Sequence, residues 1–331
     1  MPDTFHTRVP SPRRRHRRRQ RRFLLVLLLF ACAALLYSIG QAVFPLLFPL
    51  TESPLRAFIP RPAAVSAGVP AISVPDGLYS RCAVLADLES GEILMDGSGE
   101  ERAYPASLTK IMTAAVALES FPDLDATVTL TEADFAGLYE ENASLAGFQP
   151  NQEVVIRDLL YGLMLPSGAE AAAALANNAA GSQQAFVDRM NQKAQALGME
   201  GTHFTNATGL HDPDHYTTAR DMILLLRDAL QSPGFREIFT AQRHSTRETA
   251  THPGITFYST LSQVLDSPDF PGGQLLGGKT GYTQEAGLCL ASLAQKNGKE
   301  YLLVTMGAPG DHTTEPFHIL DAMRIYGEAL P

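Results

Sequence analysis

Cysteine is scarce and tryptophan is absent in this sequence: its 331 residues include three cysteines and no tryptophan. Three cysteines are too few for a disulfide framework. Cys32 lies in an apolar N-terminal run, whereas Cys82 and Cys289 lie in segments that we expect to be strands. An oxidising compartment would permit a bond between these two residues, but the pattern favours two buried thiols in a sheet.

Basic residues are few beyond residue 22, where 17 lysines and arginines stand against 34 acidic residues. This balance excludes a polyanion-binding surface in that part of the chain. The sequence also contains no internal repeat. With 331 residues, 45% of them apolar, the chain can bury a sizeable core in one large domain or two small ones.

Formal charge is missing from residues 23–44, FLLVLLLFACAALLYSIGQAVF, which follow a tail, residues 1–22, with nine arginines and one acid. As a helix these 22 residues would reach about 33 Å, enough to cross a hydrocarbon core of about 30 Å. Arginines beside an apolar span indicate the positive-inside rule rather than nucleic-acid binding. We therefore expect a basic cytoplasmic tail, a single-pass transmembrane anchor in the cell membrane and an extracytoplasmic remainder. Gly40 and Ala42 resemble a signal-peptide cleavage site, which leaves a secreted form open.

A Pro/Ala-rich linker, residues 45–76, separates the apolar run from a folded domain, residues 77–331. Strands at both ends of this domain with helices between them predict an α+β fold. We expect an antiparallel sheet of about five strands with a helical layer and a helical insert. The expected strands are 82–88, 92–95, 254–258, 275–283, 287–294 and 301–307, and the expected helices include 106–119, 182–198, 218–230 and 314–330.

Cap and turn residues mark several boundaries. Ser182 and Gly198 are typical of a helix start and a helix end. The stretches Thr131-Glu132-Ala133-Asp134 and Ser167-Gly168-Ala169-Glu170 both have the spacing of a capping box. Asn297-Gly298 predicts a tight hairpin turn, so we read Lys296-Asn297-Gly298 as part of that turn rather than as a binding motif.

The stretch PASLTKIMT places Ser107 and Lys110 three residues apart at the start of an apolar helical segment. Positions i and i+3 share a helix face, so the hydroxyl and the amine can meet. The first turn of a helix also favours developing negative charge. Burial lowers the pKa of a lysine, which would let Lys110 act as a base toward Ser107.

A second lysine lies in GGKTGY, residues 277–282, inside an expected strand. Glycines around Lys279 and Thr280 leave room for a ligand to lie against the backbone. Lys279 would supply charge and Thr280 a hydroxyl for a substrate carboxylate. Gly273 completes the literal pattern of a phosphate-binding P-loop. We reject that reading because a strand rather than a helix follows and the domain is expected outside the cytoplasm.

Together these motifs resemble those of D-alanyl-D-alanine carboxypeptidases, the low-molecular-mass penicillin-binding proteins with an active-site serine. Residues 155–172, 197–222 and 277–309 resemble the family's middle region and closing strands, and the resemblance covers residues 76–330. It implies the fold shared by penicillin-binding proteins and serine β-lactamases. It also implies cleavage of peptidoglycan stem peptides that end in D-Ala-D-Ala, inhibition by β-lactam antibiotics, and no cofactor or metal.

The resemblance assigns a role to each motif residue. Ser107 would attack the carbonyl of the penultimate D-Ala, with Lys110 accepting the proton of the hydroxyl and Ser167 returning it to the leaving D-Ala. The expected substrate-binding residues are Lys279, Thr280 and Gly281. The expected oxyanion hole consists of the backbone N–H groups of Ser107 and Tyr282.

One position departs from the family pattern. The middle motif should read S-x-N, but the chain has Ser167-Gly168-Ala169, and no serine or threonine in it has an asparagine two residues later. A lost hydrogen bond costs about 0.5–1.5 kcal/mol, roughly 2- to 15-fold in rate. Two alternatives therefore stay open: a DD-endopeptidase that cuts peptide crosslinks, and a slowly acylating penicillin-binding sensor. A β-lactamase is disfavoured because nothing in the sequence outside the family pattern indicates a glutamate dedicated to deacylation.

Other polar clusters give weaker signals. His203, His211 and His215 lie near two aspartates, but their spacing matches no zinc signature. We expect His215 to make structural hydrogen bonds. Asn177 and Asn178 are expected on a helix surface, where one of them could replace the missing amide. Because only 50 residues follow Gly281, we expect neither the extra C-terminal β-domain nor the C-terminal membrane helix common in the family.

Overall fold

The computed structural model describes residues 71–248 and 252–330. The basic tail, the apolar run 23–44 and most of the linker lie outside these residues, so the predicted membrane anchor stays a prediction. Within the described ranges, no helix combines the length and the apolar character that crossing a membrane requires.

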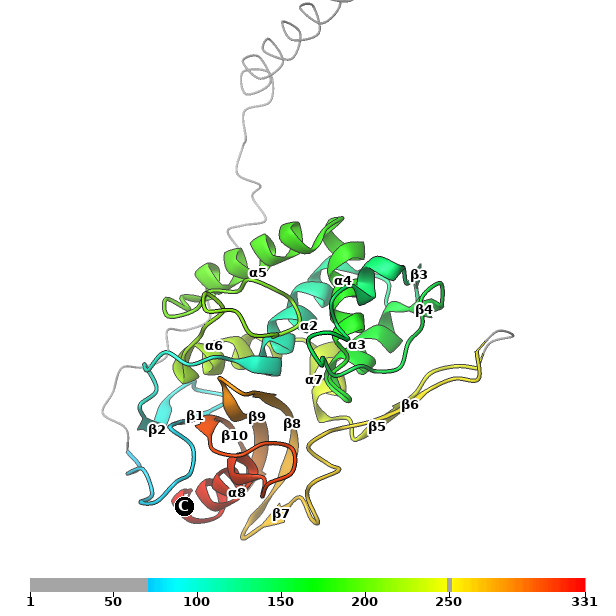
Figure 1. The fold of residues 1–331 in the computed structure, drawn as a ribbon. Coiled ribbons are helices and arrows are strands. Elements are labelled where there is room, and N and C mark those ends of the chain that lie inside the picture. The colour runs from blue at the N-terminus through cyan, green and yellow to red at the C-terminus, as the bar shows by residue number, and fades with distance from the viewer. Residues whose placement is uncertain (1–70, 249–251, 331) are drawn as a thin grey trace, which may run out of the picture. The chain divides into compact units, whose positions relative to one another are not determined.

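The centre of the fold is an antiparallel sheet of six strands in the order β2-β1-β10-β9-β8-β7 (Figure 1). Strands from the two ends of the domain are neighbours, because β1 pairs with β10 in the register Cys82↔Met306 to Asp87↔Tyr301. The α+β prediction is confirmed, and the sixth strand, β7, has only two residues. The strands are β1 Cys82–Asp87, β2 Ile93–Gly97, β7 Asp269–Phe270, β8 Gly273–Thr283, β9 Gly287–Lys296 and β10 Lys299–Ala308.

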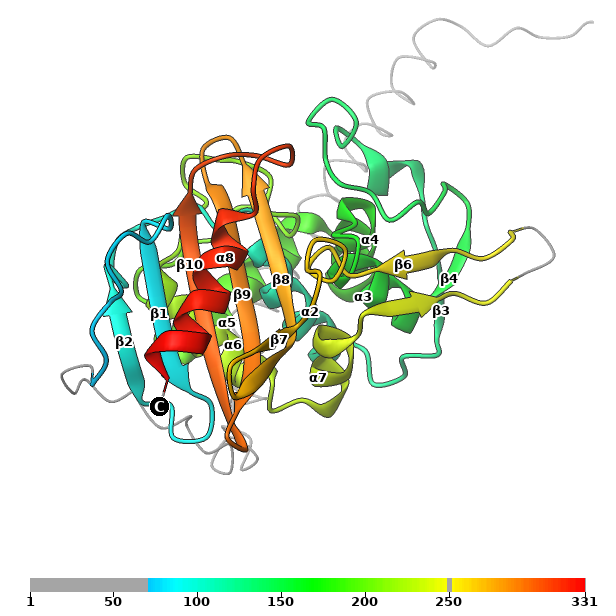
Figure 2. The ribbon, with the colours of Figure 1, turned by 90° about the horizontal axis from the view of Figure 1, so that it is seen from below.

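Helices cover both faces of the sheet, which explains why β9 and β10 read as nearly continuous apolar runs. On one face, α8 (Phe317–Arg324) lies across β10 and β9 and continues into a π-helical turn, Ile325–Ala329 (Figure 2). The helical layer packs on the other face. Its members are α2 Thr109–Ser120, α3 Ile156–Met164, α4 Ala169–Ala180, α5 Gln183–Leu197, α6 Ala219–Ala229 and α7 Pro233–Thr240.

Most of the cap and turn predictions are confirmed. Ser182 caps α5 by accepting a hydrogen bond from the N–H of Ala185 at 3.2 Å, and Gly198 ends that helix with a φ of 77°. The box at Thr131 forms at the short helix Glu132–Phe135. Asn297 and Gly298 both have positive φ, as a tight hairpin between β9 and β10 requires.

Two further predictions are confirmed by buried side chains. Cys82 and Cys289 are free, buried thiols, as the pattern favoured. Lys296, in the K-x-G stretch that we read as a turn, is buried, and its Nζ donates hydrogen bonds to the carbonyl oxygens of Tyr326, Gly327 and Leu330. It therefore stabilises the end of the chain and does not enter the site.

Two small sheets lie beside the helical layer. One pairs β3 (Thr127–Thr129) with β4 (Glu153–Val155); the other is a hairpin of β5 (Arg243–Ser245) and β6 (Thr256–Tyr258). Only the strand near 254–258 was predicted in this hairpin, since β5 is too short and polar to show an alternating pattern.

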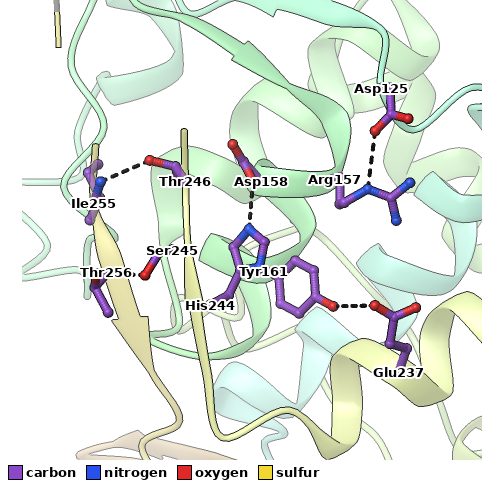
Figure 3. Close-up of polar contacts among 10 residues, drawn as sticks. All are labelled: Asp125, Arg157, Asp158, Tyr161, Glu237, His244, Ser245, Thr246, Ile255 and Thr256. Atoms are coloured by element: carbon purple, nitrogen blue, oxygen red, sulfur yellow. Dashed lines mark hydrogen bonds and ion pairs between the residues drawn. The ribbon is translucent and has the colours of Figure 1, made fainter. Parts of the chain in front are cut away.

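A hydrogen bond and a ring stack, both made by His244, attach the β5–β6 hairpin to α3 (Figure 3). Nε2 of His244 lies 2.6 Å from Oδ1 of Asp158, and the His244 ring stacks on that of Tyr161 at 3.8 Å between centroids. The Tyr161 hydroxyl in turn donates to Glu237 on α7 at 2.8 Å. Through β5, these contacts hold β6 and the residues that follow it in place. That segment leads to Thr260, which lines the site described next.

Candidate active site

Ser107 lies on a single 3-10 turn, Ala106–Leu108, immediately before α2. Ala106 has a φ of 47°, a left-handed conformation that a residue with a Cβ rarely adopts. Gly209 makes this turn possible, because a Cβ there would overlap the carbonyl oxygen of Ala106. Such local strain is typical of functional sites. It holds the serine at the edge of the helical layer.

Lys110 meets Ser107 as the i, i+3 spacing predicted. Its Nζ donates to Oγ of Ser107 at 3.1 Å and to the carbonyl oxygen of Thr208 at 2.5 Å. The side chain is 2% exposed. Burial lowers the pKa of Lys110 to about 7, against a smaller opposing effect from the charge of Glu170. A large fraction of these amines is therefore neutral near neutral pH and able to accept a proton.

One asparagine, Asn206, fixes the loop 205–210 so that its Thr208 carbonyl lies beside Lys110. Oδ1 of Asn206 accepts hydrogen bonds from the N–H groups of Thr208 and Gly209, at 3.1 and 2.8 Å, and its Nδ2 donates to the carbonyl of Leu210. We did not single out Asn206 from the sequence. The signal was an asparagine two and three residues before a threonine and a glycine, a spacing typical of Asx turns.

His215 supports the same region from beneath, as predicted. Its Nδ1 accepts the N–H of Thr205 at 3.0 Å, so its Nε2 carries the proton toward the hydroxyl of Thr109 at 2.7 Å. Burial lowers the pKa of His215 to about 4, which keeps the ring neutral. His203 points elsewhere, with Nδ1 on the carbonyl of Asp214.

The predicted capping box at Ser167 and Glu170 is wrong. Gly168 precedes α4 and no side chain caps that helix. Ser167 has a φ of 70°, and its buried Oγ has no hydrogen-bond partner among the described residues. This residue instead lines the cleft together with Ser107 and Thr280. The left-handed backbone takes the hydroxyl away from the helix N–H groups and leaves it available to a ligand.

Glu170 has a different function from the one its spacing indicated. Its Oε1 accepts the N–H groups of Ala146, Gly147 and Phe148 at 2.7, 2.9 and 3.3 Å. The carboxyl group is fully buried, and burial raises its pKa even though these N–H groups oppose the shift. Glu170 therefore fixes the wall of the cleft beside Ser167 and adds negative potential near Lys110.

Ala169 faces the cleft beside Ser107 and Lys110, where the family pattern has an amide. Neither asparagine on α4 replaces it. Asn177 donates to Asp134 at 2.6 Å and Asn178 to the carbonyl of Ala174 at 2.8 Å, and the two lie near the far end of the helix. Asn142, which we did not consider from the sequence, does line the cleft.

Strand β8 forms the opposite wall. Lys279 is fully buried, its Nζ donates to the carbonyl of Thr280 at 2.8 Å, and burial together with the charge of Lys110 lowers its pKa well below the usual value. The Thr280 hydroxyl faces that of Thr260 at 2.7 Å. Gly281 allows close approach to the serine, because a Cβ there would stand 3.1 Å from the Ser107 nitrogen. No helix follows the GKT stretch, since β8 continues to Thr283.

The structure therefore brings Ser107, Lys110, Ser167 and Thr280 around one cleft, with Lys279 buried beneath it. Two cavities meet at Ser107 and Tyr282. One, of 170 Å³, extends past Thr280 toward α8, and the other, of 610 Å³, extends past Lys110 and Ala169. A serine with a buried amine as base and an unpartnered second hydroxyl is the arrangement of a nucleophilic acyl-transfer enzyme.

This fold, and the contact of a serine with a buried lysine, define the class of active-site serine peptidases. The chain belongs to the D-alanyl-D-alanine carboxypeptidase family, peptidase S11. Residues 70–310 match the sequence pattern of that family. The D-alanyl-D-alanine carboxypeptidase of a Streptomyces species, strain K15, is 34% identical over 254 residues, which cover 73% of this chain and 84% of that relative. The DD-transpeptidase structure from Streptomyces K15 matches with a TM-score of 0.68 and 30% identity, over 76% of this chain and 98% of that one.

Relatives within the family carry two different activities in their names. DacF of Bacillus subtilis, a D-alanyl-D-alanine carboxypeptidase, is 32% identical over 248 residues, covering 73% of this chain and 61% of DacF. A D-alanyl-D-alanine endopeptidase of Escherichia coli is 31% identical over 279 residues, covering 84% of this chain and 86% of that relative. The chain thus spans less than two thirds of the length of DacF.

Proposed function

We propose that this protein is a serine-type D-Ala-D-Ala carboxypeptidase that removes the terminal D-Ala from peptidoglycan stem peptides through an acyl-enzyme on Ser107. The contact that carries this proposal is the 3.1 Å approach of Lys110 Nζ to Ser107 Oγ in a buried setting. A lysine whose pKa lies near 7 is matched to taking a proton from a hydroxyl at neutral pH.

In the acylation step, Lys110 accepts the proton of the Ser107 hydroxyl while Oγ attacks the carbonyl carbon of the penultimate D-Ala. Negative charge develops on the carbonyl oxygen, which the backbone N–H groups of Ser107 and Tyr282 would stabilise. Collapse of this intermediate breaks the peptide bond, and the leaving amine takes a proton through Ser167. The unpartnered Ser167 hydroxyl in the cleft supports this relay.

Recognition of the terminal carboxylate falls to the wall formed by β8. The Thr280 hydroxyl, paired with Thr260, faces the cleft, and the buried Lys279 orders this part of the strand by donating from Nζ to the Thr280 carbonyl. Gly281 keeps the edge of the strand open to the peptide. Water then hydrolyses the acyl-enzyme, and a β-lactam, which carries a carboxylate beside a strained amide, would acylate the same serine.

An endopeptidase that cuts crosslinked stem peptides is the second candidate. It is supported by the endopeptidase relatives of Escherichia coli and Pseudomonas aeruginosa, which are 31% and 30% identical to this chain. A slowly acylating penicillin-binding sensor is supported only by Ala169, which lacks the amide of the family motif. We further propose that residues 23–44 anchor the enzyme in the cell membrane, with the catalytic domain on the extracytoplasmic face.

The test is release of D-alanine from a Lys-D-Ala-D-Ala peptide by the full chain in detergent, with Ser107→Ala in parallel and labelled penicillin as a second probe. Release by the wild type that Ser107→Ala abolishes supports the carboxypeptidase. Labelling at Ser107 without release indicates a sensor or an enzyme restricted to crosslinked substrates, and a crosslinked muropeptide separates these two. If folded protein showed no labelling and released no D-alanine, the proposal would be excluded.

A further inference from the structure

The smaller cavity contains a polar group that the proposed mechanism does not use. Beyond Thr280 this cavity reaches the start of α8, where His318 and Ile319 form part of its wall. His318 is 5% exposed. A side chain this deeply buried normally has its polar atoms paired within the protein.

His318 has no such pairing. Its Nδ1 is enclosed and without a hydrogen-bond partner, and no residue of 71–248 or 252–330 bonds to its Nε2. Because Nε2 is not among the enclosed unpaired atoms and the residue lines the cavity, this nitrogen faces the cavity. An unpartnered buried polar group destabilises the folded protein. A ligand in the cavity would satisfy it.

The protonation state of the ring follows from its surroundings. Burial, together with the nearby charge of His312, lowers the pKa of His318 to about 4, so the ring is neutral at physiological pH. An enclosed N–H without an acceptor is less tolerated than an enclosed lone pair. We therefore expect the proton on Nε2, which makes His318 a neutral hydrogen-bond donor aimed into the cavity.

The position of the cavity along β8 indicates what occupies it. Ser107, Ser167 and Thr280 line this cavity together with His318, which lies on α8. If Thr280 holds the terminal carboxylate, the residue after the scissile bond must lie on this side of Ser107. The remaining wall includes Val264, Leu288 and Ile319, whose apolar side chains suit a methyl group.

We propose that His318 binds the leaving residue of the substrate, donating a hydrogen bond from Nε2 to its carboxylate. This inference rests on the proposed carboxypeptidase function. His318 would thus select for substrates whose leaving group ends in a carboxylate. Asp311 and His312 also line this cavity, on the loop before α8, but both are less buried than His318.

The test uses two acyl donors that share one acyl group. The first is acyl-Lys-D-Ala-D-Ala, and the second is the S-methyl thioester of acyl-Lys-D-Ala, whose leaving group has no carboxylate. The full chain would be compared with His318→Leu, which removes the donor, and His318→Asn, which keeps a shorter one. Ile325→Val, a buried packing change at the end of α8 whose side chain does not line the cavity, is the control.

We expect His318→Leu to lower kcat/KM on the peptide about tenfold and to leave the thioester unchanged, with His318→Asn between wild type and His318→Leu. Ile325→Val should change both donors equally and little. An equal fall on both donors in His318→Leu would assign His318 a structural role only, and no change on either would exclude it from binding. Failure of the wild type to hydrolyse either donor would instead overturn the carboxypeptidase itself, and the assignment of His318 with it.

Discussion

The carbonyl oxygen of Thr208 lies 2.5 Å from Nζ of Lys110, on an amine that also lies 3.1 Å from the Ser107 hydroxyl. A neutral amine has two N–H bonds and one lone pair. With one N–H directed to the Thr208 carbonyl, the lone pair is free to face the serine proton. The contact between Lys110 and Thr208 therefore orients the base, and it depends on a loop almost 100 residues away in the sequence.

The rate of acylation should depend on pH through Lys110. Burial lowers the pKa of this lysine to about 7, so the active neutral amine disappears as pH falls through 7. We expect kcat/KM to rise with pH up to a midpoint near 7 and to fall about tenfold per pH unit well below it. Stopped-flow acylation by a β-lactam between pH 5 and 9 measures this profile.

Lys110→Arg is the matched variant for that profile, because arginine keeps the charge but does not act as a base in this range. It should lose roughly 100- to 10,000-fold in acylation rate at pH 8. A wild-type profile flat between pH 5 and 9, or a fully active Lys110→Arg, would contradict the role of Lys110 as the base.

Asn206 should support catalysis without touching the substrate. Asn206→Ala removes the acceptor of the Thr208 and Gly209 N–H groups, so the Thr208 carbonyl loses its fixed position beside Lys110. We expect kcat to fall about tenfold or more with a smaller change in KM, and the free energy of unfolding to fall by about 1–3 kcal/mol.

Two variants control the Asn206 experiment. Asn206→Asp keeps the acceptor oxygen and should retain more activity than Asn206→Ala. Asn178→Ala removes an amide whose only partner in residues 71–248 and 252–330 is the carbonyl of Ala174, and it should leave kcat unchanged. Steady-state kinetics and urea unfolding of all four proteins provide the measurement, and equal kcat in Asn206→Ala and wild type would exclude this positioning role.

The local spacing of Ser107 and Lys110 was enough to predict their contact, because residues three apart in a helical turn must meet. Lys279 and Thr280 were placed on the correct strand because glycines and apolar neighbours indicated it. Glu170 was misread, since the same spacing serves a capping box and a buried carboxylate that binds a distant loop. The Asx turn of Asn206 was visible in the local sequence. Its position beside Lys110, and that of His318 at the cavity, depend on the packing of segments far apart in the chain, which no local pattern specifies.

Glu170 should tune both the stability of the cleft wall and the pKa of Lys110. Glu170→Gln keeps the shape, but a carboxamide cannot reproduce a charged acceptor for three N–H groups, so we expect a loss of about 1–3 kcal/mol in unfolding free energy. The Glu170 charge raises the pKa of Lys110. Its removal should therefore move the midpoint of the pH–acylation profile to lower pH, and a shift to higher pH would contradict the assigned electrostatics.

Ala169→Asn tests whether the missing amide slows this enzyme. Ala169 is 1% exposed but lines the 610 Å³ cavity together with Ser107 and Lys110, so we expect an asparagine amide at this position to reach the bound peptide. One regained hydrogen bond is worth about 0.5–1.5 kcal/mol, so we expect kcat/KM for D-Ala release to rise roughly 2- to 15-fold. Ala169→Leu, which has the same branching as asparagine, a larger volume and no amide, is the control and should lower kcat/KM by obstructing the cleft. If Ala169→Asn lowers kcat/KM for D-Ala release as much as Ala169→Leu does, this cleft has adapted to alanine. The departure from the family motif would then reflect a different substrate rather than a weakened site.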